Sequence, residues 1–173
     1  PSDINDLSIM GIKKENNFHE LLLKAEHFCG YRERCTYEVK QKLKELGAGE
    51  IDTEKVITSL LEDDYLNDER FARLFASGKF RIKRWGKNKI RTELKMKKIL
   101  DAFIKKGLDT IDEEEYLKTI EYLIKKKEKE VKSQKSTRLS DRQEVKNQKI
   151  GMYLLSKGFE PELIWKVLKQ VHT

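Results

Sequence analysis

The sequence predicts an all-α protein made of three tandem three-helix repeats, which together form an elongated, curved helical array. Three observations lead to this prediction. Apolar residues recur at a helical spacing of three or four positions along most of the chain. Only two prolines and nine glycines interrupt 173 residues, of which 39% are charged and 38% are apolar. Apolar positions also recur after about 50 to 60 residues, which is typical of repeat proteins.

The repeat is clearest in the second helix of each unit. Two apolar positions four residues apart recur there, as Val39 and Leu43, Ile90 and Leu94, and Ile150 and Leu154. The third helices share a second set, namely Val56, Phe103 and Leu163, followed directly by Ile57, Ile104 and Ile164. We therefore predict repeats over residues 17–66, 67–112 and 113–173. Residues 1–16 have little periodicity and are predicted to be a loose N-terminal arm.

The first repeat opens with a helical pattern that starts at Phe18 and stops at Gly30. Thr36 is predicted to cap the second helix, because a hydroxyl can accept a hydrogen bond from a free backbone N–H. The third helix is expected to start near Asp52 or Thr53.

The second repeat begins at Asn67, whose short side chain is predicted to cap a helix. The residues that follow form one helical stripe, which we expect to be buried: Phe71, Leu74, Phe75, Gly78 and Ile82. Because glycine costs about 1 kcal/mol relative to alanine inside a helix, Gly78 predicts close approach of a neighbouring backbone. Two shorter helices should follow over residues 88–98 and 100–107.

The third repeat is predicted to start with a long helix that carries apolar residues from Tyr116 to Val131. Ser140 or Asp141 can cap the helix after it. Gly158 should end that helix, and Pro161 suits the first turn of the last one.

Composition and charge favour a protein that binds polyanions. The formal charge is +7 and the pI is about 9.2, which suits nucleic acid, a nucleoprotein or an acidic protein surface. A well-solvated surface explains the net charge equally well. Two cysteines are too few for a disulfide framework and no leader segment is recognised, so we expect a cytoplasmic protein. The apolar runs are too short to cross a bilayer, and we expect a monomer with no membrane contact.

No pattern of catalytic or cofactor-binding residues is found. The sequence lacks a Gly-rich phosphate loop, a GxSxG turn and HExxH or CxxC spacing. His19, His27, Cys29 and Cys35 form the only ligand-like group, and the two histidines are eight residues apart. A structural zinc ion needs four ligands in a closed geometry. We therefore expect two partly buried thiols, no metal, no cofactor and no enzymatic activity.

The acidic groups of the sequence suggest an alternative to a non-enzymatic protein, namely a metal-dependent nuclease. Those at residues 68–69 and 112–115 have a simpler explanation, because acids in the first turn of a helix oppose the helix dipole. Glu62, Asp63 and Asp64 come at the end of a predicted helix, where this explanation fails. We interpret these three residues as contacts with a basic partner.

The basic segment over residues 79–106 is the strongest functional signal. It contains twelve Lys or Arg residues against two acids. Phe80 lies opposite the predicted apolar stripe, where it can stack on a base, fill a partner pocket or pack against an adjacent repeat. A second basic run, over residues 125–142, is more mixed and is interpreted first as a solvated helix end. The predicted contacts with a partner or nucleic acid are Lys79, Phe80, Arg81, Lys83, Arg84, Lys87, Lys89, Arg91 and Lys95.

The stretch YLNDERFARLFASGKFRIKRWGKNKIRTELKMKKI resembles the central segment of the RecX regulatory family. In that family a YLDDxRFA-like turn and helix precede a basic stretch, a glycine and an IxxEL helix. The segments YEVKQKLKELG, VITSLLEDDYL and LLSKGFEPELIWKVL are similar to the flanking repeats, so the resemblance covers about residues 18–171. Two residues depart from the family pattern, since Asn67 replaces a common acid and Gly107 replaces an apolar residue.

The resemblance implies a non-catalytic regulator of the RecA recombinase. Members of the family lie in the groove of the RecA filament on single-stranded DNA. They restrain filament growth, ATP hydrolysis, strand exchange and coprotease activity in DNA repair and the SOS response. The resemblance thus implies RecA as the partner, with phosphate contacts to single-stranded and also double-stranded DNA.

The residues themselves leave one further binding mode open, a DNA-binding protein of helix-turn-helix type that acts without RecA. It would use the helix over residues 88–98 as its recognition helix. Lysine dominates that helix, which favours phosphate contacts over base reading.

Overall fold

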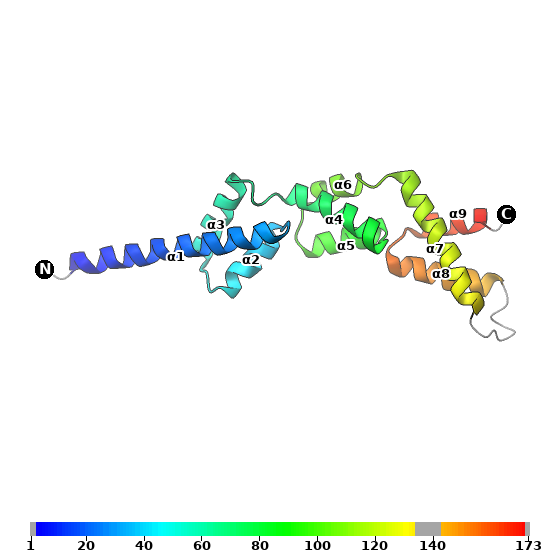
Figure 1. Cartoon of the computed structure of the whole chain (residues 1–173), viewed down its shortest axis with the longest axis horizontal. Helices are drawn as coiled ribbons and strands as arrows, with labels where there is room; N and C mark the ends of the chain where they lie inside the picture. The colour runs from blue at the N-terminus through cyan, green and yellow to red at the C-terminus, as the bar shows by residue number, and fades with distance from the viewer. Residues whose placement is uncertain (1–2, 134–142, 172–173) are drawn as a thin grey trace. The chain divides into compact units, whose positions relative to one another are not determined.

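The computed structural model describes the backbone of residues 3–133 and 143–171 and the side chains of residues 17–131 and 143–171. Within these ranges every regular element is a helix (Figure 1), which confirms the predicted all-α repeat fold. The helices are α1 (Asp3–Tyr31), α2 (Thr36–Glu45), α3 (Glu50–Glu62), α4 (Asp68–Lys83), α5 (Lys87–Met96), α6 (Asp101–Leu108), α7 (Glu113–Ser133), α8 (Gln143–Lys157) and α9 (Pro161–Val171). The predicted caps Ser140 and Asp141 lie outside the described residues.

The chain folds into two compact units, residues 1–71 and 72–173. In the first unit α1, α2 and α3 all contact one another around an apolar core. Cys29 and Cys35 are buried and are not joined by a disulfide, and burial raises the pKa of Cys29 to about 11. The core consists of Leu21, Ala25, Cys29, Val39, Leu43, Val56, Ile57, Leu60 and Leu66.

The start of the chain differs from the prediction. The sequence predicts a loose arm over residues 1–16, but α1 begins at Asp3 and continues to Tyr31. A helix extends at little cost once a packed segment has formed it, as the segment from Phe18 onward does here. Gly11 alone costs only about 1 kcal/mol, so weak periodicity does not end the helix.

The turn after the second helix of each repeat has the same conformation. Its central residue has a positive φ, of 78° at Gly47, 59° at Lys98 and 89° at Gly158. The N–H of the next residue donates to a carbonyl five residues back, at 3.0 Å for Ala48 to Leu43, 3.2 Å for Ile99 to Leu94 and 3.2 Å for Phe159 to Leu154. A residue in the left-handed conformation commonly follows the end of an α-helix, and this residue is usually glycine. The second repeat forms it with lysine, which lacks the conformational freedom of glycine.

The core of the second unit joins the second and third repeats. Tyr116 of α7 is fully buried, and its ring packs against Phe80 of α4 and Phe159, with centroid distances of 5.6 and 5.2 Å. Its hydroxyl donates to Glu160 Oε2 at 2.6 Å and accepts the N–H of Lys87 at 2.9 Å. These bonds satisfy the buried phenol, so the two repeats share one hydrogen-bonded core.

Helix α4 buries a different face from the predicted one. Ala72, Ala76 and Phe80 are buried at four-residue spacing, whereas Leu74 is 55% exposed and Ile82 is 76% exposed. The predicted stripe is therefore wrong for Leu74 and Ile82, and the prediction that Phe80 contacts a partner is wrong because Phe80 packs in the core. Both faces of α4 carry apolar residues. The alanines face inward because small side chains allow neighbouring helices to approach closely.

Close backbone approach occurs at Gly107 and not at Gly78. A Cβ atom at Gly78 would meet nothing within 4 Å, so the expectation for Gly78 is wrong. A Cβ atom at Gly107 would lie 2.7 Å from the carbonyl oxygen of Ala72. Gly107, which departs from the family pattern, is thus the residue that lets α6 pack directly on α4.

Candidate nucleic-acid and partner interface

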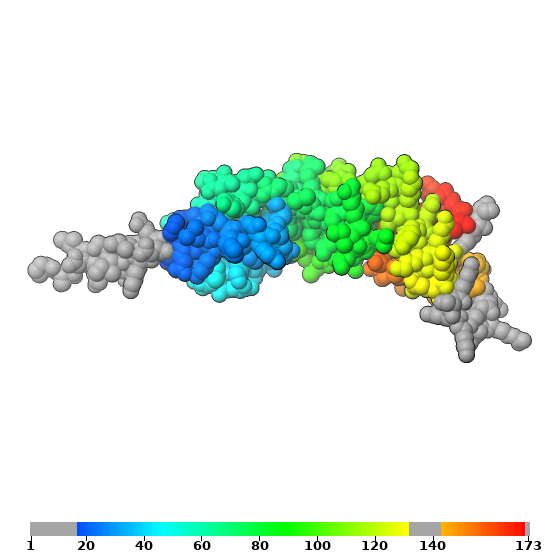
Figure 2. Space-filling view, in the orientation of Figure 1, coloured from blue at the N-terminus to red at the C-terminus, as the bar shows by residue number. Residues whose placement is uncertain are grey.

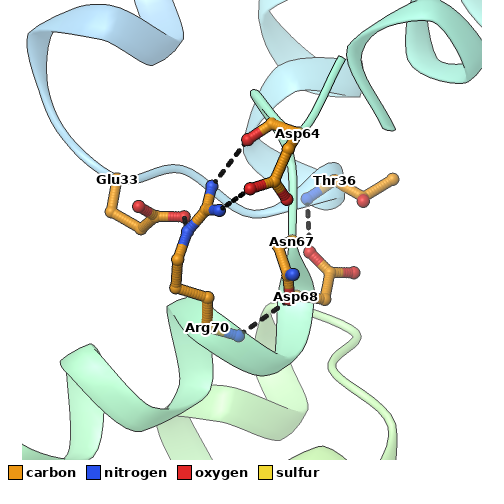
Figure 3. A network of polar contacts seen from close by, with 6 residues as sticks. All are labelled: Glu33, Thr36, Asp64, Asn67, Asp68 and Arg70. Atoms are coloured by element: carbon orange, nitrogen blue, oxygen red, sulfur yellow. Dashed lines mark hydrogen bonds and ion pairs between the residues drawn. The ribbon is translucent and has the colours of Figure 1, made fainter. Parts of the chain in front are cut away.

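The acidic end of α3 takes part in an internal network at the start of α4 (Figure 3). The Arg70 guanidinium donates from Nε to Glu33 at 3.0 Å and from its terminal nitrogens to the Asp64 carboxylate at 2.8 Å and the Asp64 carbonyl at 3.0 Å. Asp64 also has a φ of 56°, a conformation that commonly ends a helix. Asp64 is therefore exposed but paired within the fold, and the partner contact of Glu62, Asp63 and Asp64 stays a prediction.

The residues at the start of α4 cap two helices (Figure 3). Asn67 Oδ1 accepts the N–H of Arg70 at 2.9 Å, which confirms the predicted cap. Asp68 Oδ1 accepts the N–H of Thr36 at 2.8 Å. Thr36 is thus the first residue of α2 and not its cap, and the acceptor comes from 32 residues further along the chain.

In the second unit the end of α8 meets the start of α5. The N–H groups of Gly86 and Asn88 donate to the carbonyls of Lys157 at 2.8 Å and Gly158 at 3.0 Å. Carbonyls left free at the end of one helix thus satisfy N–H groups left free at the start of another. A Cβ atom at Gly86 would overlap the backbone of Gly158, and one at Gly158 would overlap Lys89. Only glycine fits at these two positions, so the backbone fixes the junction.

This junction gathers five basic side chains that we call the junction cluster: Lys83, Arg84, Lys89, Lys126 and Lys157. Lys157 Nζ donates to the carbonyl oxygen of Lys83 at 3.2 Å. Partial burial lowers the pKa of Lys157, and the charges of the other four residues lower it further. The junction cluster is therefore a concentration of positive charge.

Aromatic rings hold the cations of this surface in place. Lys79 Nζ and Lys89 Nζ lie 4.9 and 4.8 Å from the centroid of Trp85, and the Arg84 guanidinium lies 4.6 Å from the centroid of Tyr122. Contacts between a cation and an aromatic face order a long side chain without neutralising its charge. Trp85 therefore orders the cations beside it.

Three of the remaining predicted cations line a pocket of about 500 Å³ between α5 and α6, and Arg81 is exposed on α4. Lys87, Arg91 and Lys95 lie along α5 at four-residue spacing, and Lys105 of α6 lines the same pocket. Three of the four pair with carboxylates, as Lys87 with Glu113 at 2.6 Å, Lys95 with Asp101 at 3.3 Å and Lys105 with Asp109 at 2.8 Å. This surface is largely neutralised, so it attracts a polyanion less strongly than the junction cluster does.

The structure thus brings Lys83, Arg84 and Lys89 together and adds two residues that sequence reasoning missed. Lys126 belongs to the run interpreted as a solvated helix end, and Lys157 was not singled out. The repeat pattern marks the position of Lys157, because it precedes the turn glycine Gly158. Its contact with Lys83, 74 residues earlier, depends on packing between repeats.

Other kinds of site receive no support from the residues with described side chains. Among them no group of three or more His, Cys, Asp or Glu residues is arranged to hold a metal ion. In the same part of the chain no helix is both long and apolar enough to cross a membrane.

The fold and the basic junction define a helical-repeat protein with a charged binding surface. Residues 67–108 match the family model of the second three-helix domain of RecX. The chain is 26% identical to the regulatory protein RecX of Bacillus cytotoxicus over 169 residues, which cover 98% of this chain and 60% of that protein. It is 33% identical to the regulatory protein RecX of Lactobacillus johnsonii over 116 residues, which cover 65% of this chain and 42% of that protein.

Two solved structures share the fold. The crystal structure of RecX from Lactobacillus salivarius has a TM-score of 0.81 at 22% identity and covers 91% of this chain and 98% of its own. The crystal structure of a regulatory protein RecX has a TM-score of 0.83 at 19% identity, with coverages of 95% and 77%. The chain thus contains a segment that matches the second three-helix domain of RecX, and it is similar to regulatory proteins RecX over most of its length. It spans 60% of the length of its Bacillus relative.

Proposed function

We propose that this protein binds the RecA filament on single-stranded DNA and inhibits its growth, ATP hydrolysis, strand exchange and coprotease activity. Its similarity to regulatory proteins RecX supports a regulatory role. The observation that carries the proposal is the junction cluster, in which Lys157 Nζ lies 3.2 Å from the carbonyl oxygen of Lys83 and four neighbouring cations lower the pKa of Lys157. The phosphates of DNA are a polyanion of the kind that such a cluster attracts.

The geometry of the junction favours phosphate binding for a second reason. The backbone bonds from Gly86 and Asn88 hold α5 and α8 together, and Trp85 and Tyr122 order the side chains of Lys89 and Arg84. Cations that are already held in place lose less conformational entropy when they bind. A rigid cluster therefore binds phosphates more tightly than the same residues on a mobile segment.

The alternative of direct, sequence-specific DNA binding through α5 is less well supported. A recognition helix contacts base edges with residues near its N-terminus. The N-terminal end of α5 is occupied, because Gly86 and Asn88 donate their N–H groups to the end of α8. Residues further along α5 offer lysines, which bind phosphates without reading sequence.

The proposal is tested by adding this protein to RecA assembled on single-stranded DNA and measuring the rate of ATP hydrolysis at moderate salt. We expect the rate to fall as the protein concentration rises. DNA-free RecA provides the background rate. An unchanged rate across the titration, with the protein folded by circular dichroism, would refute the proposed function.

A further inference from the structure

The outer face of α4 carries an apolar stripe that the fold leaves uncovered. Leu74, Gly78 and Ile82 follow one another at four-residue spacing and so lie on one side of the helix. We call these three residues the outer stripe. Leu74 is 55% exposed and Ile82 is 76% exposed. Figure 2 shows the green surface of the second unit, to which α4 contributes, open to the viewer.

Gly78 makes a notch in the middle of this stripe. A Cβ atom there would meet nothing within 4 Å, so the space beside the helix backbone is open. Leu74 lies one turn before the notch and Ile82 lies one turn after it. Rows of residues four apart form the ridges and grooves by which helices pack against one another. The outer stripe therefore has the shape that receives a ridge of side chains from another helix.

The charge around the outer stripe indicates the chemistry of that helix. Arg70, before the stripe, pairs with Glu33 and Asp64, whereas Lys79, Arg81 and Lys83 follow the notch in a stretch, residues 70–92, that contains no acid. Arg81 lies beside the stripe and is exposed, and Lys79 lies over the rings of Phe75 and Trp85 at 5.1 and 4.9 Å. An occupant with acidic residues beside its apolar ridge would complement both the shape and the charge.

We propose that the outer stripe is the docking site for an amphipathic helix of a protein partner, with acidic residues flanking an apolar ridge that fills the notch at Gly78. The inference rests on the proposed function, in which the partner helix belongs to the protein of the filament. In this proposal the junction cluster binds the phosphates of the DNA, and the outer stripe binds the partner protein. The side chains of Leu74 and Ile82 contribute to binding only by burying apolar surface against the partner helix.

The test uses two variants that alter the stripe in different ways. Gly78→Leu fills the notch and replaces a glycine with a good helix former, so the melting temperature should rise. Ile82→Asp places a charge in the apolar contact. Each variant should weaken binding to RecA assembled on oligothymidylate by about tenfold, the effect expected of a central interface residue. Binding to oligothymidylate alone, measured at low salt, should be unchanged for Gly78→Leu, which alters no charge, whereas Ile82→Asp places its charge beside Lys83 and should weaken it slightly.

Two matched variants serve as controls. Gly30→Leu makes the same change at an exposed helical glycine of α1 that also has open space around it, and Ile51→Asp makes the same change at an isoleucine of α3 that is 65% exposed. Both controls should bind the filament like the wild type. A Gly78→Leu variant that is more stable and binds less tightly cannot be explained by misfolding.

The outcomes separate this inference from the proposed function. If the stripe variants bind the filament like the wild type while loss of the junction cluster weakens binding, the docking site is wrong and the proposed function survives. If the stripe variants also weaken binding to bare oligothymidylate tenfold, the stripe contacts nucleic acid and the inference is wrong. If the wild type does not bind the filament, both proposals fail.

Discussion

Two charged segments of this protein each follow a helix that ends at a residue with a positive φ. In one segment the charges form ion pairs, whereas in the other charges of the same sign lie together. After α3 the residue is Asp64, with a φ of 56°, and after α4 it is Arg84, with a φ of 50°. Around Asp64, Arg70 pairs with two acidic residues of the same unit. Near Arg84, the charges of Lys83, Arg84, Lys89 and Lys126 all lower the pKa of Lys157. A charge run in a sequence can therefore form ion pairs within the fold, as at Asp64, or gather charges of one sign, as at Arg84.

The two segments also differ in what holds them. Side-chain hydrogen bonds to Glu33 and Asp64 fix Arg70. In the junction cluster, backbone hydrogen bonds at Gly86 and Gly158 fix the helices, and the Lys157 ammonium adds a hydrogen bond to the carbonyl oxygen of Lys83. Substitutions should therefore destabilise the first segment through lost ion pairs and the second through backbone overlap.

The largest effect is expected for Gly86→Ala, which places a methyl group into the backbone of Gly158. It should lower the free energy of unfolding by about 3 kcal/mol or more, as overpacking at a fixed backbone does. Chemical denaturation of both proteins measures the change. Gly49→Ala is the matched control, because Gly49 precedes α3 with nearly the same φ and ψ and has open space around it. If Gly86→Ala and Gly49→Ala lowered the free energy of unfolding equally, the close packing of Gly86 against Gly158 would be contradicted.

Removal of the paired charge should cost less. Arg70→Ala leaves Glu33 and Asp64 without their shared partner, and we expect a loss of about 2 kcal/mol, less than for a fully buried pair because all three side chains are partly exposed. Arg81→Ala removes an exposed arginine of the same helix and should change stability little. Thermal unfolding compares the two, and a similar effect of both would mean that the Arg70 network is not stabilising.

Sequence reasoning located most of the helices and three of the five residues of the junction cluster, Lys83, Arg84 and Lys89. The cap at Asn67 and the helix end at Gly158 follow from local residue preferences, which are read from a few neighbouring positions. The inward face of α4 was misjudged because Phe80 and Ile82 are both apolar and periodicity cannot decide between two apolar faces. The contact of Lys157 with Lys83 depends on how two repeats pack, and no local pattern encodes that packing.

A third prediction tests whether filament binding depends on the total charge of the basic segment or on where its lysines lie. Lys98→Gly removes a lysine that adopts a φ of 59° and should raise the free energy of unfolding by about 1 kcal/mol, because glycine adopts this conformation without strain. Lys98 is not part of the junction cluster, so binding to the filament should be unchanged. Lys97→Gly, at a φ of −84°, is the control and should not stabilise the protein. Loss of filament binding by Lys98→Gly would indicate that total charge matters more than its position.

The smallest effect is the pH dependence of stability that Lys157 contributes. Because its pKa is lowered in the folded protein, the folded state binds this proton less tightly than the unfolded chain does. Between the lowered pKa and the ordinary value of 10.5, the free energy of unfolding should therefore rise with pH. Partial exposure of Lys157 keeps this effect small. Urea titrations of the wild type and Lys157→Gln over this range should show a shallower rise for the variant. A steeper rise for Lys157→Gln than for the wild type would contradict the conclusion that the folded state lowers the pKa of Lys157.

The central claim is that the positive charge of the junction cluster contacts the DNA of the filament. Its most direct test compares two triple variants that remove equal charge from the second unit. One changes Lys83, Lys89 and Lys157 to Gln, and the other changes Lys95, Lys105 and Lys118, each paired with a carboxylate, to Gln.

The measurement is the affinity for RecA on single-stranded DNA over a range of salt concentrations. The junction variant should bind much more weakly and with a lower salt dependence, because fewer counterions are released when fewer phosphates are neutralised. The paired variant should stay close to the wild type. Equal losses of affinity and of salt dependence in the two variants would contradict the claim.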